Sequence, residues 1–282
     1  MPIWLRKADM KCKLLILVMA MMFVGCDTPD VKEKEGPLGR ELRYSFTTEG
    51  EEGIHMEVFL PSEELSTGVA IIDCPGGAYY KFGGAFEGTY WAEHFNAIGC
   101  AYAVLYYSFP KGDPAVPRHD LERAVGIFLE NAVNWGIDKR RIGVMGFSAG
   151  GHLASTVATH PSKSWKPGFQ ILFYPVITMG TGTHTRSRQE LLGENPSQAL
   201  IEEFSNELHV TGDTPKCFLT YASNDTSVSP KYNSEAYYKA LVENGVEVQR
   251  VAYPSGGHGW TVDSFAYAKD IRNKLIEWVS NL

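Results

Sequence analysis

The sequence predicts a doubly wound α/β fold, in which a mostly parallel sheet carries helices on both faces and a small cap insertion. Three observations predict it. Short apolar runs alternate along the chain with amphipathic segments of helical period, which is typical of parallel sheets. A serine flanked by glycines, Ser148, stands where one apolar run gives way to a helical segment. The alternation is interrupted by one long stretch, 175–213, which is typical of an insertion with a task of its own.

The strands and helices follow from this alternation in chain order. Runs 42–48 and 53–60 predict an antiparallel lead-in at a sheet edge, and the continuous apolar runs after them predict buried parallel strands. Pro117 near the start of one helical segment and Gly136 after its end mark its boundaries. The predicted parallel strands are 69–74, 100–107, 141–145, 169–174, 216–222 and 246–253. The predicted helices are 88–97, 117–135, 151–160, 231–244 and 267–281, with shorter helical pieces at 189–192 and 197–204 in the cap.

The first 25 residues are predicted to be a signal peptide and not part of the fold. Four basic side chains precede the apolar run 14–24, which is short for a membrane span. The end of this run, Phe23-Val24-Gly25-Cys26, resembles the lipobox of bacterial lipoproteins. The resemblance implies cleavage before Cys26, lipidation of its thiol and a lipid-anchored location in the bacterial cell envelope. A plain secretory peptide and a single membrane anchor are the alternatives. Polar residues 26–41 predict a tether, and 42–282 the folded domain.

Net charge and cysteine usage exclude several classes of function. The formal charge is −7, and removing four basic residues and one acid with residues 1–25 gives −7 − 3 = −10. A chain this acidic, without a basic stripe, is not expected to bind nucleic acid. The remaining Cys74, Cys100 and Cys217 lie in apolar runs without regular spacing. They are predicted to be buried small hydrophobic side chains, not disulfides or zinc ligands.

The stretch Gly146-Phe147-Ser148-Ala149-Gly150 has the pattern of a nucleophile elbow. Small residues on both sides let the chain turn sharply from strand to helix, so that the serine hydroxyl stands above the carboxyl edge of the sheet. The alternative is a glycine-rich turn that binds a phosphate or nothing. A catalytic serine also needs a histidine base and an orienting acid, which follow it in the order acid, then histidine.

Two later residues fit that order. Asp225 follows the predicted strand 216–222, and His258 stands in Gly256-Gly257-His258-Gly259-Trp260 after strand 246–253. Both are predicted to lie in loops at the carboxyl edge of the sheet, beside Ser148. The other candidates fit less well. Asp213 precedes its strand, Asp263 follows the histidine, and His152 is expected to pack under the elbow or bond to backbone. The remaining histidines precede the proposed acid: His55, His94, His119, His160, His184 and His209.

An oxyanion hole needs backbone N–H groups near the serine. Ala149, directly after Ser148, is predicted to supply one. The loop Cys74-Pro75-Gly76-Gly77-Ala78-Tyr79 follows a central strand, where esterases place a His-Gly-Gly-Gly loop, so Gly77 and Ala78 are predicted to supply the others. A phosphate loop is the alternative, but the lysine and spacing of a P-loop are missing.

Together these motifs resemble the α/β-hydrolase carbohydrate esterases, and bacterial acetyl-xylan and feruloyl esterases in particular. The resemblance rests on Pro75-Gly76-Gly77, the elbow region 141–154, Leu191-Leu192-Gly193, the stretch 214–225 and the segment around His258. Asn224 and Ala78 depart from the residues that this family often has there. The resemblance implies a serine esterase that removes acetyl or related acyl groups from plant polysaccharide such as xylan, without a metal or cofactor. Aromatic side chains on the nearby loops are candidates for stacking on sugar or for packing beneath those loops: Tyr79, Tyr80, Phe82, Phe86 and Trp260.

Other functions remain as alternatives. A serine exopeptidase of the same fold would need a handle for a peptide amine and usually a larger additional domain. A glycan-binding lipoprotein without catalysis would not need the intact set of three residues. A glycosidase would need two facing carboxylates, and no such pair is predicted.

Overall fold

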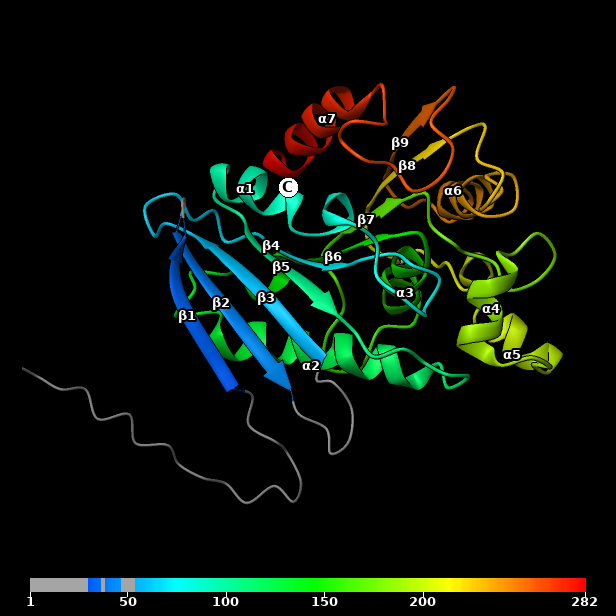
Figure 1. Cartoon of the computed structure of the whole chain (residues 1–282), viewed down its shortest axis with the longest axis horizontal. Helices are drawn as coiled ribbons and strands as arrows, with labels where there is room; N and C mark the ends of the chain where they lie inside the picture. The colour runs from blue at the N-terminus through cyan, green and yellow to red at the C-terminus, as the bar shows by residue number, and fades with distance from the viewer. Residues whose placement is uncertain (1–29, 37–38, 47–53) are drawn as a thin grey trace, which may run out of the picture.

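The computed structural model describes residues 30–36, 39–46 and 54–282, and it confirms the α/β class (Figure 1). Nine strands form one sheet in the order β1-β2-β3-β5-β4-β6-β7-β8-β9. From β5 to β9 all neighbours are parallel, while β1, β2 and β3 join the sheet antiparallel. The strands are β1 Asp30–Gly36, β2 Gly39–Phe46, β3 Ile54–Pro61, β4 Ala70–Cys74, β5 Ala101–Tyr106, β6 Ile142–Phe147, β7 Gln170–Phe173, β8 Cys217–Ala222 and β9 Val248–Tyr253.

Strand β1 differs from the tether that the sequence predicts for residues 26–41. Asp30–Gly36 pairs along its length with β2. Its side chains are mostly charged and lack the apolar alternation that identifies a strand in sequence. Cross-strand charge pairs support the pairing instead, with Lys34 Nζ 2.6 Å from Glu41 and Arg40 Nε 3.2 Å from Glu33. The strand is therefore a polar edge, which is a common way to protect a sheet from edge-to-edge association.

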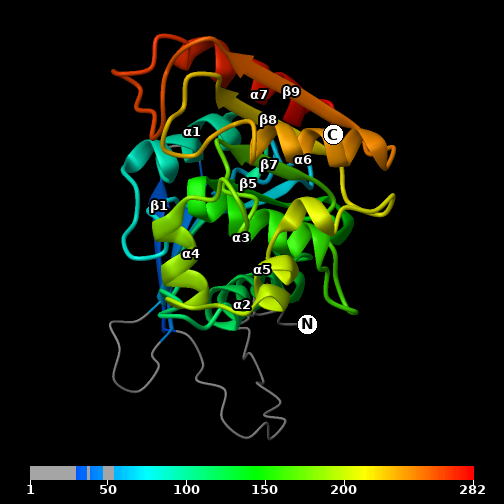
Figure 2. The same cartoon turned by 90° about the vertical axis from the view of Figure 1, so that its right-hand side faces the viewer.

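Helices cover both faces of the sheet. Helices α1 and α7 lie on one face, and α2, α3 and α6 lie on the other (Figures 1 and 2). Strands β4, β6 and β8 are buried along their whole length between these layers, which explains their continuous apolar sequences. The helices are α1 Tyr90–Ala97, α2 Ala115–Asn131, α3 Ser148–Thr159, α4 Thr185–Leu192, α5 Gln198–Glu203, α6 Ser234–Glu243 and α7 Ala268–Ser280, with 3-10 turns η1 Ala85–Glu87, η2 Lys139–Arg141 and η3 Asn206–Leu208. In the described part of the chain, none of these helices has the length and apolar character needed to cross a bilayer.

The predicted insertion carries α4, α5 and η3, beside α3 at the end of the sheet where β6 leads into it (Figures 1 and 2). Asn233, just before α6, accepts the N–H of Ile177 at 2.9 Å and so holds the start of the segment. Asn206, fully buried in η3, donates to the carbonyl of His152 at 3.1 Å and to Ser155 Oγ at 2.8 Å. The insertion is thus tied to the same helix that Ser148 begins.

Candidate active site

Ser148 stands at the sharp turn between β6 and α3. Its φ is +51°, in the left-handed region that non-glycine residues rarely adopt. The turn is possible because its neighbours lack side chains: a Cβ on Gly146 would overlap the carbonyl of Gly150, and a Cβ on Gly150 would overlap the carbonyl of Cys74. The local sequence therefore forces the serine hydroxyl out of the strand and holds it at the helix N-terminus.

The structure brings Ser148, His258 and Asp225 together in one hydrogen-bonded chain. Ser148 Oγ lies 2.8 Å from His258 Nε2, and His258 Nδ1 lies 2.7 Å from Asp225 Oδ2. The second carboxylate oxygen of Asp225 accepts the N–H groups of Ser227 and Val228, both at 2.9 Å. Because the buried carboxylate faces Nδ1, the proton belongs on Nδ1, and Nε2 is free to accept the serine proton.

The three side chains come from loops at the carboxyl ends of β6, β8 and β9. Parallel strands end at one edge of a sheet, so these loops meet there. Asn224 joins two of them, because its side-chain oxygen accepts the N–H of Gly257 at 2.9 Å. The residue that departs from the resembled family therefore holds the acid loop against the histidine loop.

The loop after β4 packs directly against the elbow. A Cβ on Gly76 would lie 3.1 Å from Ser148 Cβ, so glycine is required for this approach. Gly77, Ala78 and Tyr79 follow with φ angles of +125°, +56° and +65°. Within the described residues, the N–H groups of Gly77 and Ala78 donate no hydrogen bond to the protein. Ala149 lies in the first turn of α3, where N–H groups have no acceptor inside the helix.

Glu87 is a buried carboxylate that the sequence analysis missed. Its Oε2 accepts the N–H of Gly76 at 3.1 Å, and its Oε1 accepts the hydroxyl of Tyr174 at 2.8 Å. The pKa of Glu87 is raised above its ordinary value, because the effect of burial exceeds the opposing effects of the hydrogen bond from Tyr174 and of the nearby charge of His258. The glutamate follows a glycine-rich loop and belongs to no motif, so only its contacts identify it.

Tyr174 connects Glu87 to the histidine. Its ring packs edge-on against the His258 ring, with centroids 4.8 Å apart and planes at 63°. Trp260 packs against the same tyrosine at 4.8 Å. Tyr174 has a φ of +35°, another strained position for a non-glycine residue. The acid, the tyrosine and the tryptophan therefore form the wall that supports the histidine ring.

His152 lies under the elbow, as the sequence predicts. Its Nδ1 lies 2.9 Å from the Tyr79 hydroxyl, and its Nε2 lies 2.8 Å from the carbonyl of Phe204 in the cap. Since a carbonyl can only accept, Nε2 carries the proton and Nδ1 accepts from the tyrosine. Burial lowers the pKa of His152 to about 4, so the ring is neutral at pH 7 and connects the loop after β4 to the cap.

Other candidates lie away from this set of residues. Asp213 and Asp263 are exposed, and neither contacts His258 among the described hydrogen bonds. His184 begins α4 of the cap. Burial, and next the charge of His258, lower the pKa of His184, so this residue of the cap lies within electrostatic reach of His258. Cys74, Cys100 and Cys217 are buried free thiols, as the sequence predicts. The predicted signal peptide and the predicted lipidation site Cys26 lie outside the described residues.

Of the five aromatic side chains that are candidates for sugar stacking, Tyr79, Phe86 and Trp260 are buried. Phe82 is half-buried and packs 5.0 Å from Phe109. Tyr80 is 42% exposed, and the guanidinium of Arg186 from α4 lies 4.5 Å from its ring centre. Only Tyr80 among the five presents an exposed face.

Comparisons with known proteins agree with this geometry. A family model described as an alpha/beta hydrolase fold matches residues 76–262. Over 232 residues the chain is 35% identical to an acetylxylan esterase of Xylanibacter ruminicola, covering 80% of this chain and 48% of that protein. Over 254 residues it is 32% identical to endo-1,4-beta-xylanase B of Butyrivibrio fibrisolvens, covering 84% of this chain and 39% of that protein. The chain therefore spans half or less of the length of these two relatives.

A solved structure gives a more complete match. The crystal structure of an acetyl ester-xyloside bifunctional hydrolase from Caldicellulosiruptor lactoaceticus matches with a TM-score of 0.74 and 32% identity. The match covers 81% of this chain and 88% of that one. The family match, the sequence relatives and this structure agree on one assignment. The chain belongs to the α/β-hydrolase fold family.

Proposed function

We propose that this protein is a serine esterase that removes acetyl or related acyl groups from plant polysaccharide such as xylan or its oligomers. One observation carries the proposal: Ser148, His258 and Asp225 form a continuous hydrogen-bonded chain with distances of 2.8 and 2.7 Å. The loop that packs against Ser148 carries backbone N–H groups that have no acceptor among the residues that the structure describes. This combination activates a hydroxyl and stabilises an oxyanion, which are the two needs of acyl transfer.

Each residue has a defined role in the proposed reaction. Ser148 Oγ attacks the ester carbonyl while its proton moves to His258 Nε2, and Asp225 stabilises the imidazolium that forms. The N–H groups of Gly77, Ala78 and Ala149 donate to the oxyanion, and losing one such donor costs about 3 kcal/mol of transition-state stabilisation. His258 then gives its proton to the leaving sugar oxygen. A water activated by the same nitrogen hydrolyses the acyl-enzyme and restores Ser148.

Three observations support a carbohydrate ester as the substrate. The named relatives include an acetylxylan esterase and an acetyl ester-xyloside hydrolase, both at more than 30% identity. Tyr80 offers an exposed ring just after the loop that supplies the oxyanion donors, and aromatic faces suit sugar rings. The formal charge of −7 also favours a neutral or weakly charged substrate over a polyanion.

Glycosidase activity has less support from the side chains at this site. Such a reaction needs two carboxylates that face the sugar across a gap. The two carboxylates here, Asp225 and Glu87, are both buried and are engaged by His258 and by Tyr174 with Gly76, respectively. Exopeptidase activity would need a free charged group for the peptide terminus, whereas Arg186, which lies beside Tyr80, is paired with Glu190.

The decisive experiment measures acetate and ferulate released from native xylan by mass spectrometry. We expect acetate release by the wild-type protein and at least a 10³-fold loss in Ser148→Ala. Ser164→Ala, an exposed serine in the loop before β7, is the matched control and should keep full activity. Unchanged turnover in Ser148→Ala would refute the nucleophile. Turnover of 4-nitrophenyl xyloside or of an aminoacyl 4-nitroanilide that exceeds ester turnover would favour the glycosidase or the exopeptidase instead.

We further propose that the protein is a lipoprotein anchored in the bacterial cell envelope through Cys26, with no other contact to the membrane. The support is the basic segment, the apolar run and the lipobox-like Phe23-Val24-Gly25-Cys26. Radiolabelled palmitate should enter the protein in a host that processes lipoproteins. Cys26→Ala should abolish the label, whereas Cys12→Ala should not, and equal labelling of both variants would refute the anchor.

A further inference from the structure

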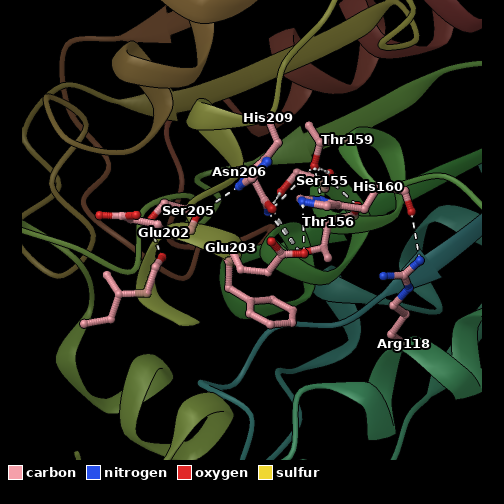
Figure 3. A network of polar contacts seen from close by, with 12 residues as sticks. Arg118, Ser155, Thr156, Thr159, His160, Glu202, Glu203, Ser205, Asn206 and His209 are labelled. Atoms are coloured by element: carbon pink, nitrogen blue, oxygen red, sulfur yellow. Dashed lines mark hydrogen bonds and ion pairs between the residues drawn. The ribbon is translucent and has the colours of Figure 1, made fainter. Parts of the chain in front are cut away.

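A cluster of potential metal ligands lies where the cap meets the C-terminal end of α3 (Figure 3). It consists of His160, directly after α3, Glu203, the last residue of α5, and His209, directly after η3. One ligand atom from each residue lies within 4.8 Å of the others. The catalytic proposal uses none of the three, and the sequence analysis set both histidines aside because they precede Asp225.

Within the described residues, one ring nitrogen of His160 is hydrogen-bonded and the other makes no hydrogen bond. Its Nδ1 lies 3.0 Å from Thr159 Oγ1 and 3.3 Å from the carbonyl of Thr156, so Nδ1 carries the proton. Its Nε2 is buried and makes no hydrogen bond among the described residues, although it lies 3.9 Å from a carboxylate oxygen of Glu203. A buried, unprotonated nitrogen that faces a carboxylate is either an unsatisfied polar atom or a ligand.

In His209 too, one ring nitrogen donates a hydrogen bond and the other keeps its lone pair. Its Nε2 donates to the carbonyl of Glu202 at 2.9 Å, which leaves the lone pair on Nδ1. The two imidazole rings lie 4.4 Å apart between centroids. Metal-binding histidines usually donate their other N–H to a carbonyl or carboxylate, which fixes the tautomer and the ring orientation. Both rings already have that support.

The backbone around the cluster is fixed by buried hydrogen bonds. Asn206 of η3 donates to Thr156 Oγ1 at 3.0 Å and to Ser155 Oγ at 2.8 Å on α3 (Figure 3). Arg118 of α2 donates to the carbonyl of His160 at 3.0 Å. The positions of both histidines are therefore set by the fold, and the exposed Glu203 side chain is the part that can move onto an ion.

We propose that His160, Glu203 and His209 bind one zinc ion, or a similar first-row divalent cation, with water completing the coordination. Two imidazoles and one carboxylate are a ligand set that zinc uses in proteins. Bond lengths of about 2.0–2.1 Å in a tetrahedron place ligand atoms about 3.3 Å apart, so the three ligand atoms, which lie within 4.8 Å of one another, need to move closer by about 1.5 Å or less when the ion binds. The ligands lie far apart in the chain, so no sequence motif predicts them.

The ion would fasten the cap to the nucleophile helix and would take no part in the chemistry. Twelve residues of α3 separate Ser148 from His160, which is about 18 Å along a helix. The ion therefore cannot reach the substrate carbonyl. It links α5 and η3 to the end of the helix whose first residue is the nucleophile, and so stabilises the folded state by binding to it.

The test uses the protein purified without a polyhistidine tag, treated with EDTA and desalted. After addition of zinc chloride and gel filtration, the wild type should retain one zinc per chain, measured with a chromophoric chelator. Its Tm, followed by circular dichroism, should rise by about 5 °C at saturating zinc. Glu203 is exposed and His209 is half-buried, and His209→Ala and Glu203→Gln should each lose both the bound zinc and the rise in Tm.

His119→Ala removes an exposed histidine on α2 and is the matched control, which should retain both effects. Two results would overturn the proposal. The wild type could retain no zinc after gel filtration, in which case His160 and Glu203 form only an ion pair when the ring is protonated. Alternatively, His209→Ala could retain as much zinc as the wild type, which would assign the bound metal to other residues.

Discussion

The hydroxyl of Tyr174 donates a 2.8 Å hydrogen bond to Glu87, and the ring of the same tyrosine packs against His258. Glu87 also accepts the N–H of Gly76, beside Ser148. One buried acid is therefore in contact with both halves of the site: the loop after β4, which packs against Ser148, and Tyr174, which packs against the ring of His258. We infer that Glu87 is a positioning residue, because it acts through Gly76 and Tyr174 and not on the substrate.

Glu87→Gln tests this role, since glutamine keeps an acceptor for Gly76 and a partner for Tyr174 but removes the charge. We expect kcat for 4-nitrophenyl acetate to fall about tenfold. The charged groups facing His258 are Asp225, Glu87 and, when protonated, His184. Losing one negative charge disfavours the imidazolium, so the acid limb of the kcat/KM profile should move to lower pH.

A purely structural role for Glu87 would lower the Tm without moving the pH profile. Glu93→Gln, on the exposed face of α1, is the control and should change neither quantity. An unchanged acid limb in Glu87→Gln would contradict the electrostatic part of this inference.

Asp225→Asn should preserve the packing around His258 but favour the wrong tautomer of the ring. We expect kcat to fall by about 10⁴, because the proton then sits on the nitrogen that must accept from Ser148. The control is Asp213→Asn, which changes the exposed aspartate that the sequence analysis weighed as the alternative acid. Steady-state kinetics with 4-nitrophenyl acetate measure kcat of both variants. A loss below tenfold in Asp225→Asn would remove this residue from the triad.

Gly77→Ala should damage the oxyanion loop. The φ of Gly77 is +125°, and a Cβ there would overlap the carbonyl of Lys81, so the loop must shift away from Ser148. We expect kcat/KM to fall by 10²–10³-fold, comparable to losing one oxyanion donor. Gly84→Ala adds the same methyl group to a glycine of ordinary φ with open space around it, and activity should remain. Equal activity of the two variants would exclude Gly77 from the loop's function.

Tyr80→Ala should weaken binding of acetylated xylo-oligosaccharides while leaving small esters unaffected. Tyr80 exposes its ring and is stacked under Arg186, so it can contribute a platform for a sugar ring. We expect KM for the oligosaccharide to rise about fivefold to tenfold, with little change in kcat for 4-nitrophenyl acetate. Tyr80→Phe keeps the ring and should restore oligosaccharide binding. The same KM in all three proteins would place the sugar elsewhere.

Because His152 is buried in its neutral form, we expect the free energy of unfolding to fall in mildly acidic solution. Burial lowers its pKa from the ordinary 6.5 to about 4, so between these pH values the ring is protonated in the unfolded chain and neutral in the folded chain. Stability is therefore complete above pH 6.5 and is lost as the pH falls toward 4, by on the order of 3 kcal/mol. Urea unfolding at pH 7 and pH 4.5 measures the difference. His152→Gln should show a smaller loss than the wild type, and the exposed His119→Gln the same loss as the wild type.

Local patterns in the sequence were enough for the alternation of strands and helices and for the elbow at Ser148. The spacing of apolar residues along the chain indicates whether each segment is a helix or a strand. The glycines at 146 and 150 permit a turn that larger residues would block. Asp225 and His258 could be predicted because parallel strands end at one edge, so chain order implies proximity. Strand β1 was missed because charge pairs, and not apolar alternation, hold it to the sheet.

Only the tertiary structure revealed the contacts of five further residues: Glu87 with Tyr174, and His160 with Glu203 and His209. Each belongs to no motif, and its partners lie on other elements at distances that only packing determines. The sequence by itself determined the fold class and predicted that Ser148, Asp225 and His258 meet at one edge of the sheet, because these depend on local periodicity and strand order. The folded chain decided what supports them, since burial and close contact between distant segments do not exist until the layers pack.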